Sequence, residues 1–180
     1  MADRKLFIGL DVGGTSVKMG LFDEAGELLG KGSVPTPPLI DSAGYTAVTD
    51  GITALLGAAS EQAEQVRGIG LAIPCPVPAD GVIRMQANIQ INAPLERHCP
   101  NAAVRFENDA NAAAMGELWA GTAKGFKSFV FVTIGTGVGG GVVVDGHVVS
   151  GGVGAGGEIG HLCMNPTEER SCGCGGKGHL

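Results

Sequence analysis

The chain has 180 residues, of which 44% are hydrophobic and 17% are charged, and it carries a net charge of −6. This balance can bury a core and excludes a disordered chain, while the acidic charge excludes the basic face that nucleic acid requires. Asp11 interrupts the first apolar run almost at once, and the uncharged stretch Ser128–Val144 is short for a membrane span. We therefore expect a cytoplasmic protein without a secretion signal or a membrane anchor.

The first half of the chain predicts an antiparallel meander followed by a helix and a buried strand. Gly- and Asp-containing turns separate the three apolar runs of the meander, which are Leu6–Asp11, Val17–Phe22 and Leu28–Thr36. Apolar residues three and four apart predict a helix over Ala43–Val66. A strand is expected at Gly68–Pro74, and a loop rich in Pro, Asn and Gly follows over Cys75–Asn92.

The second half predicts a short strand at Val104–Glu107, a helix at Ala110–Ala120, and two strands around a glycine turn, Phe129–Ile134 and Gly141–Val144. The plan of strand, Gly/Thr turn and return strand ending near Asp and Gly therefore occurs twice, once in each half. This repetition predicts two similar lobes. We place an N-terminal lobe at residues 1–118 and the start of a second lobe at residues 119–180.

Both glycine turns have the composition of a phosphate site. Glycine lets backbone N–H groups come close to phosphate oxygens, and threonine adds a hydroxyl donor. Lys18 on the return strand can reach a phosphate, and Asp11 can hold a magnesium ion through water. The alternative is that both are simple hairpin turns. The expected phosphate and magnesium residues are Asp11, Gly13, Gly14, Thr15, Lys18, Gly135, Thr136 and Gly137.

Two other nucleotide motifs are excluded by their context. The spacing Gly135-x-Gly137-x-x-Gly140 matches a dinucleotide fingerprint, but valines rather than a helix follow it. A Walker A pattern is also absent from the sequence.

A candidate catalytic base stands at a strand-to-helix junction. Asn108 and Asp109 precede an alanine-rich helix, and a carboxylate there can orient a sugar hydroxyl and accept its proton. The alternative is that Asp109 is an ordinary helix N-cap. Glu158, among small neighbours, is a second candidate acid.

Four potential metal ligands lie within the last 20 residues of the sequence: His161, Cys172, Cys174 and His179. A glycine-rich loop that offers four N and S ligands is typical of a structural zinc site. Cys163 is a spare candidate, and free cysteines in a loose tail are the alternative reading. Zinc in this loop would position His161 and Glu158.

Together, these motifs resemble the ROK family of repressors and kinases, most closely its bacterial glucokinases. The resemblance rests on the segments Asp11–Thr15, Glu107–Ala113, Gly135–Gly141 and Gly157–His161, and on Cys172-x-Cys174-Gly175. It implies an α/β, actin-like or hexokinase-like ATPase fold of the ribonuclease H-like type, with one full lobe and an incomplete second lobe. It further implies ATP, Mg²⁺ and structural Zn²⁺, and a homodimer or homotetramer. Asp109 would be the base, and the sugar would contact Asn88, Asn108, Asp109, Glu158 and His161.

The sequence departs from the family pattern at three points. The family usually has cysteine where His179 stands and glycine where Cys75 stands. Its members run to roughly 300 residues, so we expect this chain alone to turn over poorly. The leading interpretation is phosphorylation of glucose to glucose 6-phosphate. The alternatives are an N-acylhexosamine kinase, a sugar-binding remnant without turnover, and a sugar-responsive repressor. Because the first strand is expected to begin near Leu6, we do not expect the helix-turn-helix of a repressor ahead of it.

Overall fold

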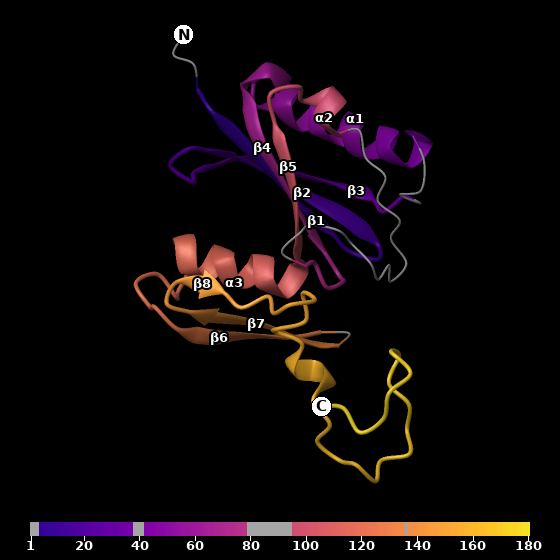
Figure 1. The fold of residues 1–180 in the computed structure, drawn as a ribbon. Helices are drawn as coiled ribbons and strands as arrows, with labels where there is room; N and C mark the ends of the chain where they lie inside the picture. The colour runs from indigo at the N-terminus through magenta and orange to yellow at the C-terminus, as the bar shows by residue number, and fades with distance from the viewer. Residues whose placement is uncertain (1–3, 38–41, 79–94, 136) are drawn as a thin grey trace. The chain divides into compact units, whose positions relative to one another are not determined.

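The computed structural model describes residues 4–37, 42–78, 95–135 and 137–180. The chain forms two compact units, one of Met1–Cys75 with Ile83–Asp109 and one of Pro76–Val82 with Ala110–Leu180. The lobe boundary expected after residue 118 stays a prediction. Figure 1 shows the elements of each unit.

The first unit is built on a five-stranded mixed sheet in the order β3-β2-β1-β4-β5. Strands β1, β2 and β3 form the expected antiparallel meander, and β4 and β5 run parallel to β1. The strands span Leu6–Val12 (β1), Ser16–Asp23 (β2), Leu28–Pro35 (β3), Val66–Ile73 (β4) and Ala103–Asn108 (β5).

Two helices, α1 (Ser42–Ala58) and α2 (Leu95–His98), cover one face of this sheet (Figure 1). Side chains of β1 alternate between buried and more exposed positions, as a strand with one face on a core requires. The fully buried large side chains of this unit form its core, and they include Leu6, Leu10, Leu21, Ile52, Ile69, Ile73 and Leu95.

The helix expected over Ala43–Val66 is shorter than predicted. It ends at Ala58, because Ser60 takes a left-handed backbone conformation with φ of 57°. The N–H of Glu61 then donates to Leu56 O at 2.9 Å, and the N–H of Ser60 donates to Gly57 O at 3.1 Å. These two bonds form a Schellman C-cap with serine where glycine is usual. A short 3₁₀ turn, Ala63–Gln65, leads into β4.

The second unit pairs the helix α3 (Asp109–Ala120) with a three-stranded antiparallel sheet. The sheet has the order β6-β7-β8. Its strands span Phe129–Ile134 (β6), Val138–Val144 (β7) and His147–Val148 (β8). Strand β7 begins three residues earlier than expected, so Gly139 and Gly140 belong to a strand rather than to the turn. A 3₁₀ turn, η2 (Ile159–His161), packs against β7 and precedes the C-terminal loop.

Glycine allows close packing of helix α3 on strand β7. A Cβ atom at Gly141 would stand 2.6 Å from the Cβ of Ala114 and 2.9 Å from the carbonyl oxygen of Ala110. A Cβ atom at Gly139 would stand 3.5 Å from the Cβ of Ala110. Small residues on both elements therefore let the two backbones approach each other.

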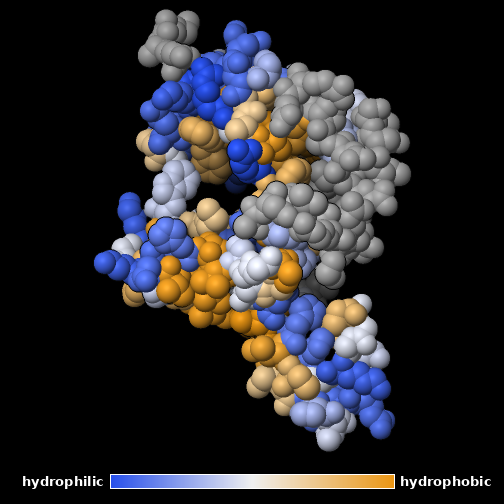
Figure 2. Space-filling model, in the orientation of Figure 1, coloured by the Kyte–Doolittle hydropathy of each residue, from blue (hydrophilic) through white to orange (hydrophobic). Residues whose placement is uncertain are grey.

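Strands β6 and β7 carry exposed apolar side chains. Ile134 is 85% exposed, and Val130, Val132 and Val144 are each about half exposed. Figure 2 shows the hydrophobic colouring over this part of the sheet. Among the described residues, no helix is both long and apolar enough to cross a membrane.

Candidate functional site

The first glycine turn closes the β1–β2 hairpin. The N–H of Gly13 donates to Ser16 O at 3.1 Å, so this donor is already used inside the turn. Gly14 and Thr15 are exposed at the tip. Gly14 is outside the left-handed region, and a Cβ atom there would meet nothing within 4 Å. Neither backbone strain nor internal packing requires glycine at position 14, so its smallness can serve an approaching ligand.

Asp11 and Lys18 face each other across the same hairpin. They are register partners on β1 and β2, and Lys18 Nζ lies 3.6 Å from Asp11 Oδ2. Both side chains are more than half exposed to solvent. A cation and a carboxylate therefore lie in the ladder pair next to Val12 and Val17, which form the last pair before the turn.

The second glycine turn joins β6 to β7. Ile134 and Val138 form the last ladder pair, and the N–H of Gly135 donates to Gly137 O at 2.9 Å. A Cβ atom at either Gly135 or Gly137 would meet nothing within 4 Å. The expected contact residue Thr136 lies outside the described residues. At each of the two tips, therefore, a glycine has no neighbouring atom where a side chain would stand.

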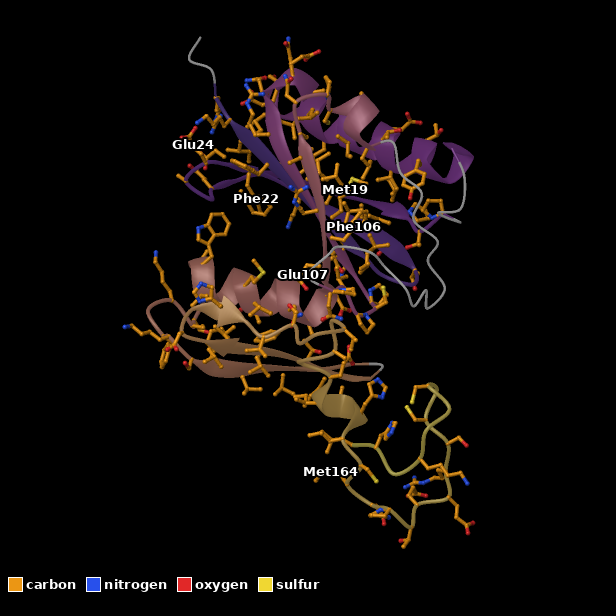
Figure 3. All side chains as sticks on the ribbon, viewed as in Figure 1. Met19, Phe22, Glu24, Phe106, Glu107 and Met164 are labelled. Carbon is orange, nitrogen blue, oxygen red and sulfur yellow. The ribbon has the colours of Figure 1, made fainter. Side chains whose placement is uncertain are left out.

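Asp109 is exposed at the first position of α3, directly after the buried Asn108 that ends β5. Asn108 Nδ2 lies 3.5 Å from Cys75 O, and the N–H of Asn108 donates to Glu107 Oε1 at 2.9 Å. Because α3 begins at Asp109, this carboxylate lies in the first helical turn, where the helix dipole stabilises it whether or not it also acts as a base. Figure 3 shows Glu107 at this end of β5.

The expected sugar contacts are only partly described. Asn108 and Asp109 are neighbours, whereas Asn88 lies outside the described residues. Cys75, which departs from the family pattern, is buried at the end of β4.

Glu158 directly precedes the turn η2 of the second unit, and His161 is the last residue of that turn. His161 Nε2 lies 3.7 Å from Glu158 Oε2. A Cβ atom at Gly160 would collide with Val138 O, and one at Gly157 would collide with Gly140 O. The glycines around Glu158 therefore let this loop lie directly on β7, and they fix the place of both side chains.

The sequence analysis did not single out Asn111, which the structure places beside the loop of Glu158. This buried side chain of α3 lies against the same loop, since a Cβ atom at Gly157 would stand 3.3 Å from Asn111 Oδ1. Its signal was an asparagine within an alanine-rich helix.

His161, Cys172, Cys174 and His179 come together as expected. One ligand atom from each lies within 4.8 Å of the others. His161 Nδ1 and His179 Nδ1 are 3.3 Å apart, and Cys174 Sγ and His179 Nδ1 are 3.5 Å apart. A tetrahedral zinc ion, with bonds of about 2.0 Å to nitrogen and about 2.3 Å to sulfur, requires spacings of about 3.3 Å and about 3.5 Å. The four residues therefore fit a structural zinc ion.

The loop around this cluster is shaped by its own backbone. The N–H of Cys172 donates to Gly176 O at 2.8 Å, and Gly175 takes a φ of 87°. A hydrogen bond from the backbone N–H of Cys174 lowers the pKa of the Cys172 thiol, which favours the thiolate that binds metal. Cys163 pairs with His179 in a β-bridge but is outside the four-residue group.

Comparison with known proteins identifies the class of this chain. The ROK family model matches residues 7–180. A glucokinase of Halalkalibacterium halodurans is 37% identical over 187 residues, which is 100% of this chain and 56% of that protein. An N-acetyl-D-glucosamine kinase of Haemophilus influenzae is 34% identical over 97% of this chain and 61% of that protein.

A solved structure agrees with these relatives. The ROK family glucokinase of Streptomyces griseus, in complex with glucose and AMPPNP, is 33% identical with a TM-score of 0.74, over 97% of this chain and 55% of that chain. The expected α/β, actin-like ATPase fold is thereby confirmed. The protein belongs to the ROK family, and it spans little more than half the length of the relatives it matches.

Proposed function

We propose that this chain is the phosphate- and sugar-binding part of an ATP-dependent hexose kinase, with glucose as the favoured acceptor. Family membership supports a sugar kinase, and the relatives with glucokinase names support glucose. Asp109 carries the proposal, because an exposed carboxylate directly follows a buried asparagine at the start of a helix. An acceptor hydroxyl needs a nearby carboxylate that can accept its proton.

In this proposal the glycine tips bind the phosphates of ATP. Gly14 and Thr15 offer backbone N–H groups and the threonine hydroxyl at the first tip, and residues 135–137 offer donors at the second. Lys18 adds a positive charge for a phosphate oxygen. Asp11 would hold Mg²⁺, which when bound would neutralise phosphate charge. Because Gly13 and Gly135 already donate within their turns, the remaining donors of each tip carry the contact.

Asp109 acts as the general base. Its carboxylate accepts the proton of the sugar hydroxyl as that oxygen forms its bond to the γ-phosphorus and the bond to the β-phosphate oxygen breaks. ADP leaves with the bridging oxygen. Asn108 and Asn88 orient the neighbouring hydroxyl groups by hydrogen bonds.

Glu158 and His161 complete the sugar contacts in the proposal. His161, Cys172, Cys174 and His179 would hold zinc, which would have a structural role. The spacing of the two Nδ1 atoms supports coordination of His161 through Nδ1. The Nε2 side of the ring then faces Glu158 and keeps that carboxylate in place.

An N-acylhexosamine kinase is the second candidate. The relative with an N-acetyl-D-glucosamine kinase name supports it at 34% identity. The loop around Cys75 and Asn88 would decide between the sugars, because it would admit or exclude a 2-acetamido group.

A turnover assay on the longest natural form of the gene product tests the proposal. ATP consumption coupled to sugar is measured with glucose, mannose and N-acetyl sugars, for the wild type, for Asp109→Asn and for the control Asp50→Asn. Asp50 is an exposed acid on α1. We expect Asp109→Asn to lower turnover about 10²- to 10⁴-fold and the control to leave it unchanged.

Each result of this assay decides between the readings. Glucose turnover that survives in Asp109→Asn excludes the base. No turnover in the wild type, together with sugar binding in a separate titration, supports a remnant instead of a kinase. Faster turnover of N-acetyl sugars than of glucose supports the second candidate.

A further inference from the structure

Thr36 holds both sides of the first glycine tip. Its hydroxyl donates to Gly13 O at 2.6 Å, and its backbone N–H donates to Thr15 O at 3.0 Å. The residue directly follows β3, 20 or more positions along the chain from the turn, and its side chain is half-buried. One threonine therefore binds the two carbonyl groups that flank Gly14.

These bonds determine where Gly14 points its donor. The carbonyl of Gly13 and the N–H of Gly14 belong to one planar trans peptide, so they point in opposite directions. When Thr36 holds the Gly13 carbonyl, the Gly14 N–H is directed away from Thr36. The bond from Gly13 N–H to Ser16 O fixes the preceding peptide in the same turn.

The local sequence makes Thr36 a stiff support. It lies between Pro35 and Pro37, whose rings fix their own φ angles. The residue before a proline is also restricted to extended conformations. In addition, Pro35 is the register partner of Ser16, so the pairing of β2 with β3 places Thr36 beside the turn.

We propose that Thr36 is a positioning residue for nucleotide binding, which aims the Gly14 N–H at a phosphate of ATP. This inference rests on the proposed function and deepens it. Thr36 itself does not contact the nucleotide. Its hydroxyl acts through the peptide between Gly13 and Gly14, and Gly14 is an exposed residue where an added Cβ atom would meet nothing within 4 Å.

Two substitutions test the hydroxyl in the longest natural form of the protein. Thr36→Val keeps the shape and removes the donor, whereas Thr36→Ser keeps the donor. The matched control is Thr49→Val, because the Thr49 hydroxyl also donates to a backbone carbonyl, Thr46 O at 3.0 Å, but does so on α1. Calorimetric titration with Mg·AMPPNP and with glucose measures the two affinities separately, and steady-state kinetics gives KM for ATP and kcat.

We expect Thr36→Val to weaken Mg·AMPPNP binding about 3- to 10-fold and to raise KM for ATP more than it lowers kcat. Glucose affinity stays unchanged, and Thr36→Ser and Thr49→Val stay within about twofold of the wild type. Equal nucleotide affinity in Thr36→Val and the wild type overturns the inference alone. A wild type that binds no Mg·AMPPNP overturns the proposed function as well.

If the Thr36→Val protein fails to fold, a measurement on the wild type still tests the inference. Hydrogen exchange of the Gly14 amide is followed with and without saturating Mg·AMPPNP. Slower exchange in the complex supports the inference, because a bound phosphate protects the aimed donor. Nucleotide binding that leaves the Gly14 exchange rate unchanged overturns it.

Discussion

The two hairpins both have glycines at the tip, but different contacts hold the two hairpins in place. The β1–β2 tip is held by hydrogen bonds, two of them from Thr36. The β6–β7 tip continues into a strand of glycines on which α3 and the loop at η2 pack closely. The β1–β2 tip is held by Thr36, which directly follows β3. The β6–β7 hairpin is held by close packing that is possible because its glycines have no side chains.

This difference separates two kinds of glycine that look alike in the sequence. At Gly14 and Gly137 a Cβ atom would meet nothing within 4 Å. At Gly140 and Gly141 it would collide with neighbouring atoms of the second unit. Only the first kind has room for a ligand, and the second kind holds the fold.

The metal centre should support the second hairpin and not the first. We expect Cys174→Ala to lower zinc affinity at least about 100-fold, because it removes one of four ligands. Metal analysis and amide exchange measure the result, and exchange should rise in the η2 loop and β7 while β1 and β2 stay protected. Cys163→Ala, which removes a thiol outside the cluster, is the control. Equal zinc content in Cys174→Ala and the wild type contradicts this account.

Packing glycines should control the stability of the second unit. We expect Gly141→Ala to lower its free energy of unfolding by about 1–3 kcal/mol, because the new methyl group would press on Ala114 and on the backbone of α3. Urea unfolding followed by fluorescence of the single tryptophan, Trp119 on α3, measures this unit. Gly116→Ala on the same helix is the control, and it should stabilise by up to about 1 kcal/mol. A stable Gly141→Ala protein would show that the close contact is absent in solution.

Tip glycines should affect binding without affecting stability. We expect Gly14→Ala and Gly137→Ala to stay within about 0.5 kcal/mol of the wild type in unfolding, since a Cβ atom there touches nothing. Each should weaken Mg·AMPPNP binding about tenfold, or about 1.4 kcal/mol, because the methyl group keeps phosphate away from the backbone. Titration calorimetry measures the affinities. If stability falls instead and affinity stays, the two kinds of glycine have been assigned the wrong way round.

The exposed face of β6 should give the smallest change. We expect Ile134→Lys to alter the free energy of unfolding by less than about 0.5 kcal/mol, because Ile134 is 85% exposed. The control Val143→Ala, at a residue only 1% exposed, should cost well over 1 kcal/mol. Urea unfolding compares them. A large loss in Ile134→Lys would mean that this face is covered in solution.

The sequence predicted the elements whose signals are local. Apolar runs predicted the strands of the meander and β6, and the polar residues Asn108 and Asp109 predicted the start of a helix. The four metal ligands were predicted from their number and clustering. Each of these signals lies within a few residues of the feature it predicts.

Features that lack their usual local signal, or that depend on distant partners, could not be predicted in this way. Helix α1 ends in a Schellman motif with Ser60 instead of glycine, so the usual stop signal was missing. A run of glycines is typical of a turn, whereas Gly139 and Gly140 pair with Thr133 and Val132 of β6 and so belong to a strand. The role of Thr36 depends on the pairing of β2 with β3, which places it beside a turn that is remote in sequence.

Amide NMR of the isotope-labelled 180-residue chain, titrated with Mg·AMPPNP, tests the central claim most directly. Phosphate bound at the two tips should move the amide resonances of Gly14, Thr15 and Gly137, while Gly116 on α3 stays in place. Binding that moves other amides and leaves both tips unchanged would contradict the account.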